Sequence, residues 1–311
     1  MSSESNETAS LQRSGFVVRK ERLYGRLIAA CAVLTIVVTV GIILALSGRA
    51  LSFWSQISPI AYFTGTSWSP VIAQNYGVLP LISGTLIVTV CSAVIALPIG
   101  LAAAVYLSEY ASDKARSILK PSLEILAGVP TVIYGYMALV YITPAFKGVF
   151  PSLRTFNALS ASIVVGIMII PMVSSISEDA LSAVPDSLRQ GGYGLGSTKF
   201  DVSTKIVVPS ATSGIVASYV LAISRAIGET MAVTMAMGMS PQMPYFPDLF
   251  RNLAESGQTI TAAMVQIANA DSLGTGPTYE AMFALGMTLF AITLTMNVFA
   301  ELVRRRFREE Y

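Results

Sequence analysis

Six long apolar segments occupy most of this chain, and they constrain its fold more than any other feature of the sequence. The first, Leu27–Leu46, holds twenty consecutive apolar or small residues, enough for a helix to cross about 30 Å of hydrocarbon. It is too long for the core of a signal peptide, so we interpret it as a membrane anchor. The other five segments are Leu81–Leu107, Ile118–Ile142, Ala158–Ser177, Ser213–Gly238 and Ala281–Val303. We therefore predict an all-α membrane protein with six transmembrane helices in contact with lipid.

The composition agrees with a membrane protein and excludes several kinds of enzyme. Hydrophobic residues make up 53% of the 311 residues and charged residues only 12%, whereas soluble domains carry about 25% charged residues. The chain has no histidine, which removes His-based zinc sites and the Ser-His-Asp triad. Cys31 and Cys91 lie inside apolar segments, where a thiol packs as a small hydrophobe. We predict no catalytic residues, no metal site and no nucleic-acid partner.

The basic residues predict the orientation of the chain in the membrane. If successive apolar segments cross the membrane in alternate directions, most of the 20 Lys and Arg residues fall on one side of the membrane. Because basic loops stay in the cytoplasm, both termini are expected there, and an even number of spans agrees. Residues 1–18 are polar and predict a disordered cytoplasmic tail, followed by a six-span domain over 19–311. The expected location is the cell membrane.

Prolines and aromatic residues add detail to this topology. Pro98, Pro130 and Pro171 lie in the second, third and fourth segments and predict kinked spans. The outer loop 239–280 is polar, with a short helix expected near Asp248–Glu255. The outer loop 47–77 is rich in aromatic residues, which fit either an interfacial belt or a docking surface for a partner: Trp54, Tyr62, Phe63, Trp68 and Tyr76.

Two ionisable residues lie inside the apolar segment Ser213–Gly238: Arg225 and, four positions later, Glu229. A charge at mid-membrane depth costs on the order of 3 kcal/mol or more, so such residues usually face a cavity. One continuous helix would place both on the same face, where they can pair. A planar, permanently charged guanidinium suits a phosphate-like oxyanion. We predict that Arg225 contacts a substrate with indirect help from Glu229; the alternative is a structural pair that holds the spans together.

Three further residues near the third segment are weaker candidates. Lys120 and Glu124 are four positions apart near its cytoplasmic end, so they predict a local salt bridge or a gating pair. Thr131 follows Pro130 and fits either a substrate path or an ordinary interhelical hydrogen bond.

The cytoplasmic loop between the fourth and fifth segments, about residues 178–212, predicts a helix, a turn and a second helix. Pro185 and Asp186 are typical of a helix start, and Gly196 is typical of a helix end. The glycines at 191–196 have P-loop spacing, but Ser197 stands where the phosphate-binding lysine belongs and no strand precedes them. We therefore expect this chain to bind no nucleotide.

The same loop resembles the EAA loop of permeases in binding-protein-dependent ABC importers, which docks the ATPase. Gln190-Gly191-Gly192 occupies the Glu-Ala-Ala position, Gly196 the following glycine, and Val208-Pro209 the terminal pair. The two glycines depart from the motif and lower helix propensity by about 1 kcal/mol each.

Four other segments resemble the PstC-type permeases of phosphate importers: Trp68–Pro70, Gly77–Thr85, Glu124–Gly135 and Arg225–Val233. The resemblance implies a type I importer fold and the import of inorganic phosphate. It also implies a second, homologous permease, two copies of an ATPase that bind ATP and magnesium, and an extracytoplasmic phosphate-binding protein. The alternatives are a permease of the same architecture for another oxyanion or small polar solute and, further off, a secondary transporter.

Overall fold

The structure is a computed structural model that describes residues 15–270 and 276–306, with side chains from 20 to 302 outside that gap. The chain divides into two compact units, residues 1–49 and 50–311. In the first unit, helix α2 (Gly15–Gln56, which continues into the second unit) carries mostly exposed apolar side chains from residue 20 to residue 49, as lipid-facing residues do. Residues 1–14 of the predicted tail lie outside the described residues, whereas α2 already begins at Gly15.

The described helices account for up to six membrane spans. Four helices are long and apolar enough to cross a bilayer: α2, α4 (Leu79–Val105), α8 (Ala158–Ser182) and α16 (Pro277–Arg306). Two further spans are bent. One joins α5 (Asp113–Ala127) to the helical run Thr131–Lys147 at 89°, and the other joins the run Lys199–Ser210 to α12 (Thr212–Ile227) at 70°.

Shorter elements complete these runs. The run Thr131–Lys147 consists of α6 (Thr131–Met137), the π-helical turn η3 (Ala138–Ile142) and α7 (Thr143–Lys147). The run Lys199–Ser210 consists of α10 (Lys199–Val202), the π-helical turn η4 (Ser203–Val207) and α11 (Val208–Ser210). Further helical elements are η2 (Tyr106–Tyr110), α9 (Asp186–Gly194), α13 (Met231–Met237), α14 (Leu249–Ala254) and α15 (Ile260–Ala268).

The prolines affect their spans unequally. Pro98 and Pro171 stay inside α4 and α8, which continue through them. Pro130 stands at the N-terminus of α6, at the 89° bend, so the predicted kink is a complete break. A proline lacks an N–H donor, and the first turn of a new helix is where that donor is not needed.

The core of the second unit is built on the contact between α4 and α8, the most extensive one between described elements. A Cβ atom at Gly100 of α4 would lie 2.7 Å from the Val173 Cβ atom of α8. Glycine therefore allows the two backbones to approach closely, as small residues do between membrane helices. Buried apolar residues from α6, α12 and α13 extend this core: Tyr134, Ala222, Ala232 and Val233.

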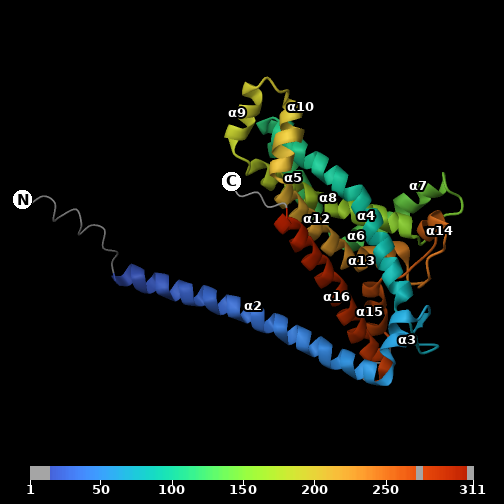
Figure 1. The fold of residues 1–311 in the computed structure, drawn as a ribbon. Helices are drawn as coiled ribbons and strands as arrows, with labels where there is room; N and C mark the ends of the chain where they lie inside the picture. The colour runs from blue at the N-terminus through green and yellow to red at the C-terminus, as the bar shows by residue number, and fades with distance from the viewer. Residues whose placement is uncertain (1–14, 271–275, 307–311) are drawn as a thin grey trace, which may run out of the picture. The chain divides into compact units, whose positions relative to one another are not determined.

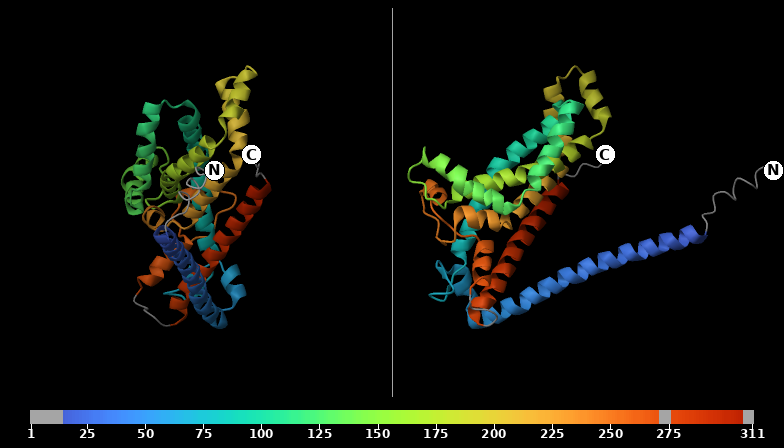
Figure 2. Two further views of the ribbon diagram at one scale, coloured as in Figure 1. Left: turned by 90° about the vertical axis from the view of Figure 1, so that its left-hand side faces the viewer. Right: turned by 180° about the vertical axis from the view of Figure 1, so that it is seen from behind.

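A second apolar cluster lies at the opposite end of this unit from α9 and α10 (Figures 1 and 2). Helix α3 (Pro59–Thr64) leads into a two-stranded antiparallel hairpin, β1 (Trp68–Ser69) and β2 (Asn75–Tyr76), in which Trp68 pairs with Tyr76. Tyr62 is fully buried, and its hydroxyl lies 3.0 Å from the Thr288 hydroxyl of α16.

The aromatic residues of loop 47–77 are therefore mostly core residues. Tyr62, Trp68 and Tyr76 are buried against α15 and α16, while Phe63 alone of the five is exposed. The expectation of a membrane-interface belt or a docking surface is wrong for the buried three, because edge-to-face ring contacts and apolar helix residues cover them. The predicted short helix after Asp248 is confirmed as α14, with the Asp248 carboxylate accepting a hydrogen bond from the Arg251 amide.

Candidate functional site

The apolar segment Ser213–Gly238 is not one helix, and this changes the geometry of its two ionisable residues. Helix α12 ends at Ile227 and α13 begins at Met231. Gly228 stands at the break, where a residue of low helix propensity is cheapest to accommodate. The prediction that Arg225 and Glu229 share one helix face is therefore wrong, and within the described residues no ion pair joins them.

Glu229 stabilises the break between α12 and α13 by accepting two hydrogen bonds. It is buried, with 9% of its surface exposed, and its carboxylate Oε1 accepts a hydrogen bond from the Ala232 amide at 3.1 Å. A carboxylate at a helix N-terminus satisfies a free N–H group and interacts favourably with the helix dipole. Thr261 of α15 donates to the Glu229 carbonyl at 2.8 Å, which satisfies a backbone acceptor freed by the break. The carboxylate thus caps α13.

Arg225 lies on the last turn of α12, and its side chain is exposed. A cation at a helix C-terminus is favoured by the helix dipole. The neighbouring Ser224 donates to the Asn297 side-chain oxygen of α16 at 2.9 Å, which holds this end of α12 against α16. The residue that follows Arg225, Ala226, is buried in the same apolar cluster as Tyr134 of α6.

Thr131 begins α6, at the other break in the membrane spans. It is half-buried, and one turn later the Tyr134 hydroxyl donates to the Leu126 carbonyl of α5 at 2.7 Å, across the bend. A Cβ atom at Gly135 would lie 2.9 Å from the Ala232 carbonyl oxygen, so α6 and α13 pack closely. The structure therefore packs α6, which begins at Thr131, against α13, which begins two residues after Glu229.

The loop 178–212 forms the helix-turn-helix that its sequence predicts. Helix α9 begins after Pro185, which is exposed, as are Gln190 and Pro209. It ends at Gly194, and Gly196 follows with a φ of +78°: the Gly196 amide donates to the Tyr193 carbonyl and the Ser197 amide to the Gly192 carbonyl. These two bonds form a Schellman motif. Thr198 then caps α10 by accepting a hydrogen bond from the Asp201 amide at 3.2 Å.

The two glycines of α9 face different surroundings. Gly191 is exposed and has open space where a Cβ atom would stand. Gly192 is buried against Ile206 and Val202. Helix α9 therefore packs on α10 and η4 through Gly192, whereas Gly191 lies on its exposed surface.

An ion pair that the sequence did not indicate fastens α9 to the end of α4. Arg189 lies 2.9 Å from Glu109 of η2, and the two side chains are 16% and 5% exposed. The hydrogen bond to Glu109 raises the pKa of Arg189 above its usual value, against the opposing effect of burial. Glu109 follows the expected second span and Arg189 lies inside the expected loop helix, but nothing in their spacing of 80 positions indicated a contact.

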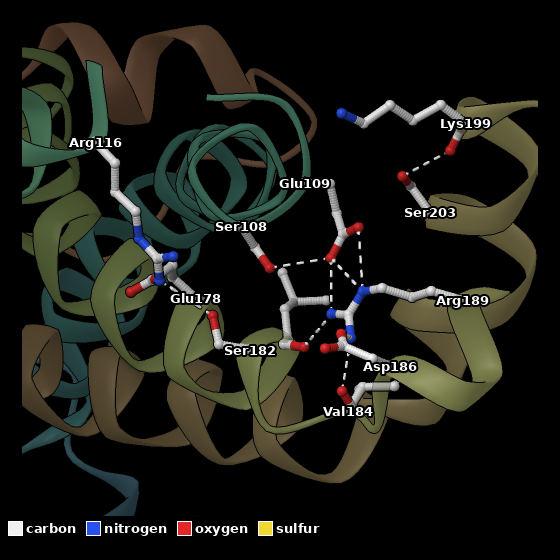
Figure 3. Close-up of polar contacts among 11 residues, drawn as sticks. Ser108, Glu109, Arg116, Glu178, Ser182, Val184, Asp186, Arg189, Lys199 and Ser203 are labelled. Atoms are coloured by element: carbon white, nitrogen blue, oxygen red, sulfur yellow. Dashed lines mark hydrogen bonds and ion pairs between the residues drawn. The ribbon is translucent and has the colours of Figure 1, made fainter. Parts of the chain in front are cut away.

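The predicted salt bridge between Lys120 and Glu124 is wrong. The Lys120 ammonium instead lies 2.6 Å from Glu178 of α8 and 3.2 Å from Asp179, and Glu124 is exposed. Arg116 also pairs with Glu178, whose side chain is completely buried (Figure 3). A buried carboxylate requires counter-charges and hydrogen bonds, whereas an exposed one is satisfied by water. This explains why Lys120 reaches across to α8.

Within the described ranges, no group of three or more Cys, Asp or Glu residues could hold a metal ion. Long apolar helices and two bent spans instead define a multi-pass membrane protein.

Comparison with known proteins identifies the family. The sequence pattern described as binding-protein-dependent transport system inner membrane component matches residues 96–309. Over 232 residues the chain is 38% identical to the Bacillus subtilis protein described as Probable ABC transporter permease protein YqgH, covering 73% of this chain and 75% of that protein. It is 34% identical to the phosphate transport system permease protein PstC of Xylella fastidiosa, covering 85% and 86% of the two chains.

A solved structure has the same fold. A chain of a bacterial alginate ABC transporter, in complex with a periplasmic protein that holds an alginate pentasaccharide, matches with a TM-score of 0.64 at 13% identity. The match covers 96% of this chain and 100% of that chain. The protein therefore belongs to the family of binding-protein-dependent transport system inner membrane components, and the predicted permease fold is confirmed.

Proposed function

We propose that this chain is a membrane-spanning permease subunit of an ATP-driven importer that moves inorganic phosphate into the cytoplasm. Phosphate is supported by the relatives named PstC, which include the Xylella fastidiosa protein and one from Haemophilus influenzae that is 31% identical over 92% of its length. The observation that carries the proposal is the exposed guanidinium of Arg225 at the break between two apolar helices.

Arg225 is well placed to contact a passing anion. Among the described residues it forms no ion pair with a carboxylate, so its charge is available. A guanidinium binds phosphate oxygens with two parallel hydrogen bonds, which orients the ion as well as attracting it. Thr131, at the neighbouring break, supplies a hydroxyl to the same path. Glu229 stabilises the break by capping α13, and this is its indirect contribution.

The partners follow from the same assignment. A second, homologous permease would complete the path on the exposed side of Arg225, and two copies of an ATPase would dock on α9 of the two permeases. An extracytoplasmic phosphate-binding protein would deliver the ion. ATP and magnesium belong to the ATPase subunits, so this chain carries no cofactor and catalyses no reaction. Both termini and α9 then lie in the cytoplasm.

Transport requires that the site in the membrane holds phosphate weakly. Closure of the ATPase dimer would displace α9 and switch the path from outward to inward access. A tightly bound ion would stall its own release, because the binding free energy must be overcome at each turnover. Selectivity then resides mainly in the binding protein, and Arg225 lowers the barrier for an anion that is already selected.

The test is uptake of labelled phosphate by cells that lack this gene and carry either the wild type or a variant. Arg225→Gln is expected to assemble normally and to lose most uptake, at least about 10-fold, because a charge-assisted contact of about 1.5–3 kcal/mol is removed. Arg225→Lys keeps the charge and loses the planar fork, so partial uptake means that charge suffices. Membrane levels of the permease and its ATPase are measured in the same cells.

The matched control is Arg154→Gln, which removes an exposed arginine paired with Glu255 at 2.6 Å, far along the chain from the breaks. It should transport like the wild type. If Arg225→Gln also does so, Arg225 has only a structural role. If the wild type restores uptake of labelled sulfate or molybdate but not phosphate, the chain serves another oxyanion.

A further inference from the structure

The C-terminal end of α4 contacts both helices of the loop 178–212, α9 and α10. Its last turn is the π-helical segment η2, an irregularity that is frequent at functional sites. Glu109 and Tyr110, the last two residues of η2, are the contact points: Glu109 contacts Arg189 of α9 (Figure 3), and Tyr110 contacts Lys199 of α10. We call these two residues the α4 clamp.

The first contact is the ion pair between Glu109 and Arg189 of α9. The Arg189 Nη2 atom donates to Glu109 Oε1 at 2.9 Å, and Nε donates to the same oxygen at 3.3 Å. Ion pairs on protein surfaces contribute little because water competes with them, but this pair is almost removed from water. Loss of Glu109 would leave the Arg189 charge without its main partner.

Arg189 also donates hydrogen bonds to backbone carbonyls at the end of α8. Its Nη1 atom donates to the Val184 carbonyl at 2.6 Å, and Nη2 donates to the Leu181 carbonyl at 2.8 Å. These carbonyls lie at and just after the last turn of α8, where helices leave acceptors free. One guanidinium thus joins α9, the end of α4 and the end of α8.

The second contact, between Tyr110 and Lys199, and a buried apolar cluster also attach the loop to α4. The Lys199 ammonium of α10 lies 5.1 Å from the centre of the Tyr110 ring, within range of a cation–π interaction. Below the polar contacts, one buried apolar cluster contains Ala104 of α4, Leu181 of α8 and Val202 of α10. The loop is therefore attached to α4 and α8 by charge, by a ring contact and by packing.

We propose that the α4 clamp transmits displacement of α9 to α4 and α8, so that these helices move together with α12 during transport. This rests on the proposed function, in which α9 receives the ATPase. Without the clamp, the loop keeps the packing of the buried apolar cluster beneath it. Its other links to the membrane spans then run along the chain, through α8 on one side and through α10 and α11 to α12 on the other. The 70° bend between α11 and α12 makes the second route indirect. Glu109 is thus a positioning residue for coupling.

The test compares phosphate uptake with ATP hydrolysis in proteoliposomes that contain the complete transporter. Glu109→Gln should lower the phosphate moved per ATP hydrolysed by about 5- to 150-fold, the usual range of coupling between sites. The matched control is Lys205→Gln, which breaks an exposed ion pair with Asp201 at 2.7 Å inside the same loop. That control should keep the wild-type ratio. An unchanged ratio in Glu109→Gln overturns the proposal.

A double variant keeps the test decisive if Glu109→Gln does not assemble. Glu109→Gln combined with Arg189→Gln removes the ion pair of the clamp without leaving a buried charge unpaired, so assembly is expected to recover. A low transport ratio in the assembled double variant supports the clamp. A wild-type ratio in that variant overturns it.

A second readout does not depend on phosphate. Cys91 lies in α4, so its labelling by a membrane-permeant thiol reagent reports movement of that helix when Cys31→Ser removes the other thiol. ATP should change the labelling rate in the wild type and in Lys205→Gln, and not in Glu109→Gln. If the rate responds to ATP through Glu109 but no phosphate is moved, the substrate is wrong and the clamp stands. If ATP changes the rate equally in all three, or in none, the clamp is wrong.

Discussion

Glu229 shows how a charge inside an apolar segment can have a structural reason. Its carboxylate accepts the Ala232 amide at the start of α13, and its backbone carbonyl accepts Thr261. A helix that stops inside a membrane protein must satisfy its free backbone groups internally, because lipid offers no partners. The carboxylate does this for one N–H group, which explains its presence without any contact with substrate.

Because the Glu229 carboxylate caps α13, two substitutions of this residue should differ in stability. Glu229→Ala removes the capping acceptor and should destabilise the protein by about 1 kcal/mol. Glu229→Gln keeps a side-chain oxygen and should lose only part of that. Thermal unfolding of the purified protein in detergent gives both values. Equal losses in the two variants would mean that the negative charge matters and not the acceptor. A Gln variant that is stable but inactive in uptake would place Glu229 on the substrate path.

At the scale of elements, helix α9 forms although two adjacent glycines disfavour it. The Schellman motif at Gly196 and the packing of Gly192 on Ile206 hold the helix in place. Gly192 is buried where α9 lies against η4, and the neighbouring position 191 is exposed. Only one of the two glycines is therefore required by the structure.

Alanine at the two positions should have opposite effects. Gly191→Ala enters open space and should stabilise α9 by up to about 1 kcal/mol through helix propensity. Gly192→Ala would place a Cβ atom 2.7 Å from Ile206 Cδ1 and 2.9 Å from Val202 Cγ2, and should destabilise by about 1–3 kcal/mol. Unfolding temperatures measured side by side test this. If both substitutions shift the temperature in the same direction, α9 does not pack through Gly192.

At the scale of the whole molecule, the second unit has two distinct ends, with α9 at one and the hairpin at the other (Figure 2). The basic residues predict that α9 faces the cytoplasm. Two exposed residues report on the two ends: Leu195, which is 88% exposed, follows α9, and Ile72, which is 92% exposed, lies between β1 and β2.

Thiol labelling of intact cells tests this orientation. Leu195→Cys and Ile72→Cys are made separately in a chain with Cys31→Ser and Cys91→Ser. A membrane-impermeant maleimide should label the cysteine at position 72 in intact cells, and the one at 195 only after the membrane is opened. The reverse pattern would place α9 outside the cell and would contradict its proposed contact with the ATPase.

Much of the fold could be predicted from local sequence features. The apolar segments indicated the spans, because lipid forces backbone groups to bond within a helix. Pro185, Gly196 and Asp248 indicated helix ends in the loops, since capping involves residues only a few positions apart. The break after Arg225 was missed because Gly228 is tolerated inside many helices. Its stabilising partner, Thr261, lies 32 positions away.

The sequence by itself thus determined the class of protein, the spans and the helical loop, all of which depend on lipid and on neighbours along the chain. The tertiary structure alone decided which charges meet. Lys120 pairs with Glu178 and not with the nearer Glu124, and Arg189 pairs with Glu109 across 80 positions, because a carboxylate removed from water requires a counter-charge, whereas an exposed one is satisfied by water. Burial is a property of the packed molecule, so these partners exist only once α4, α8 and α9 have come together.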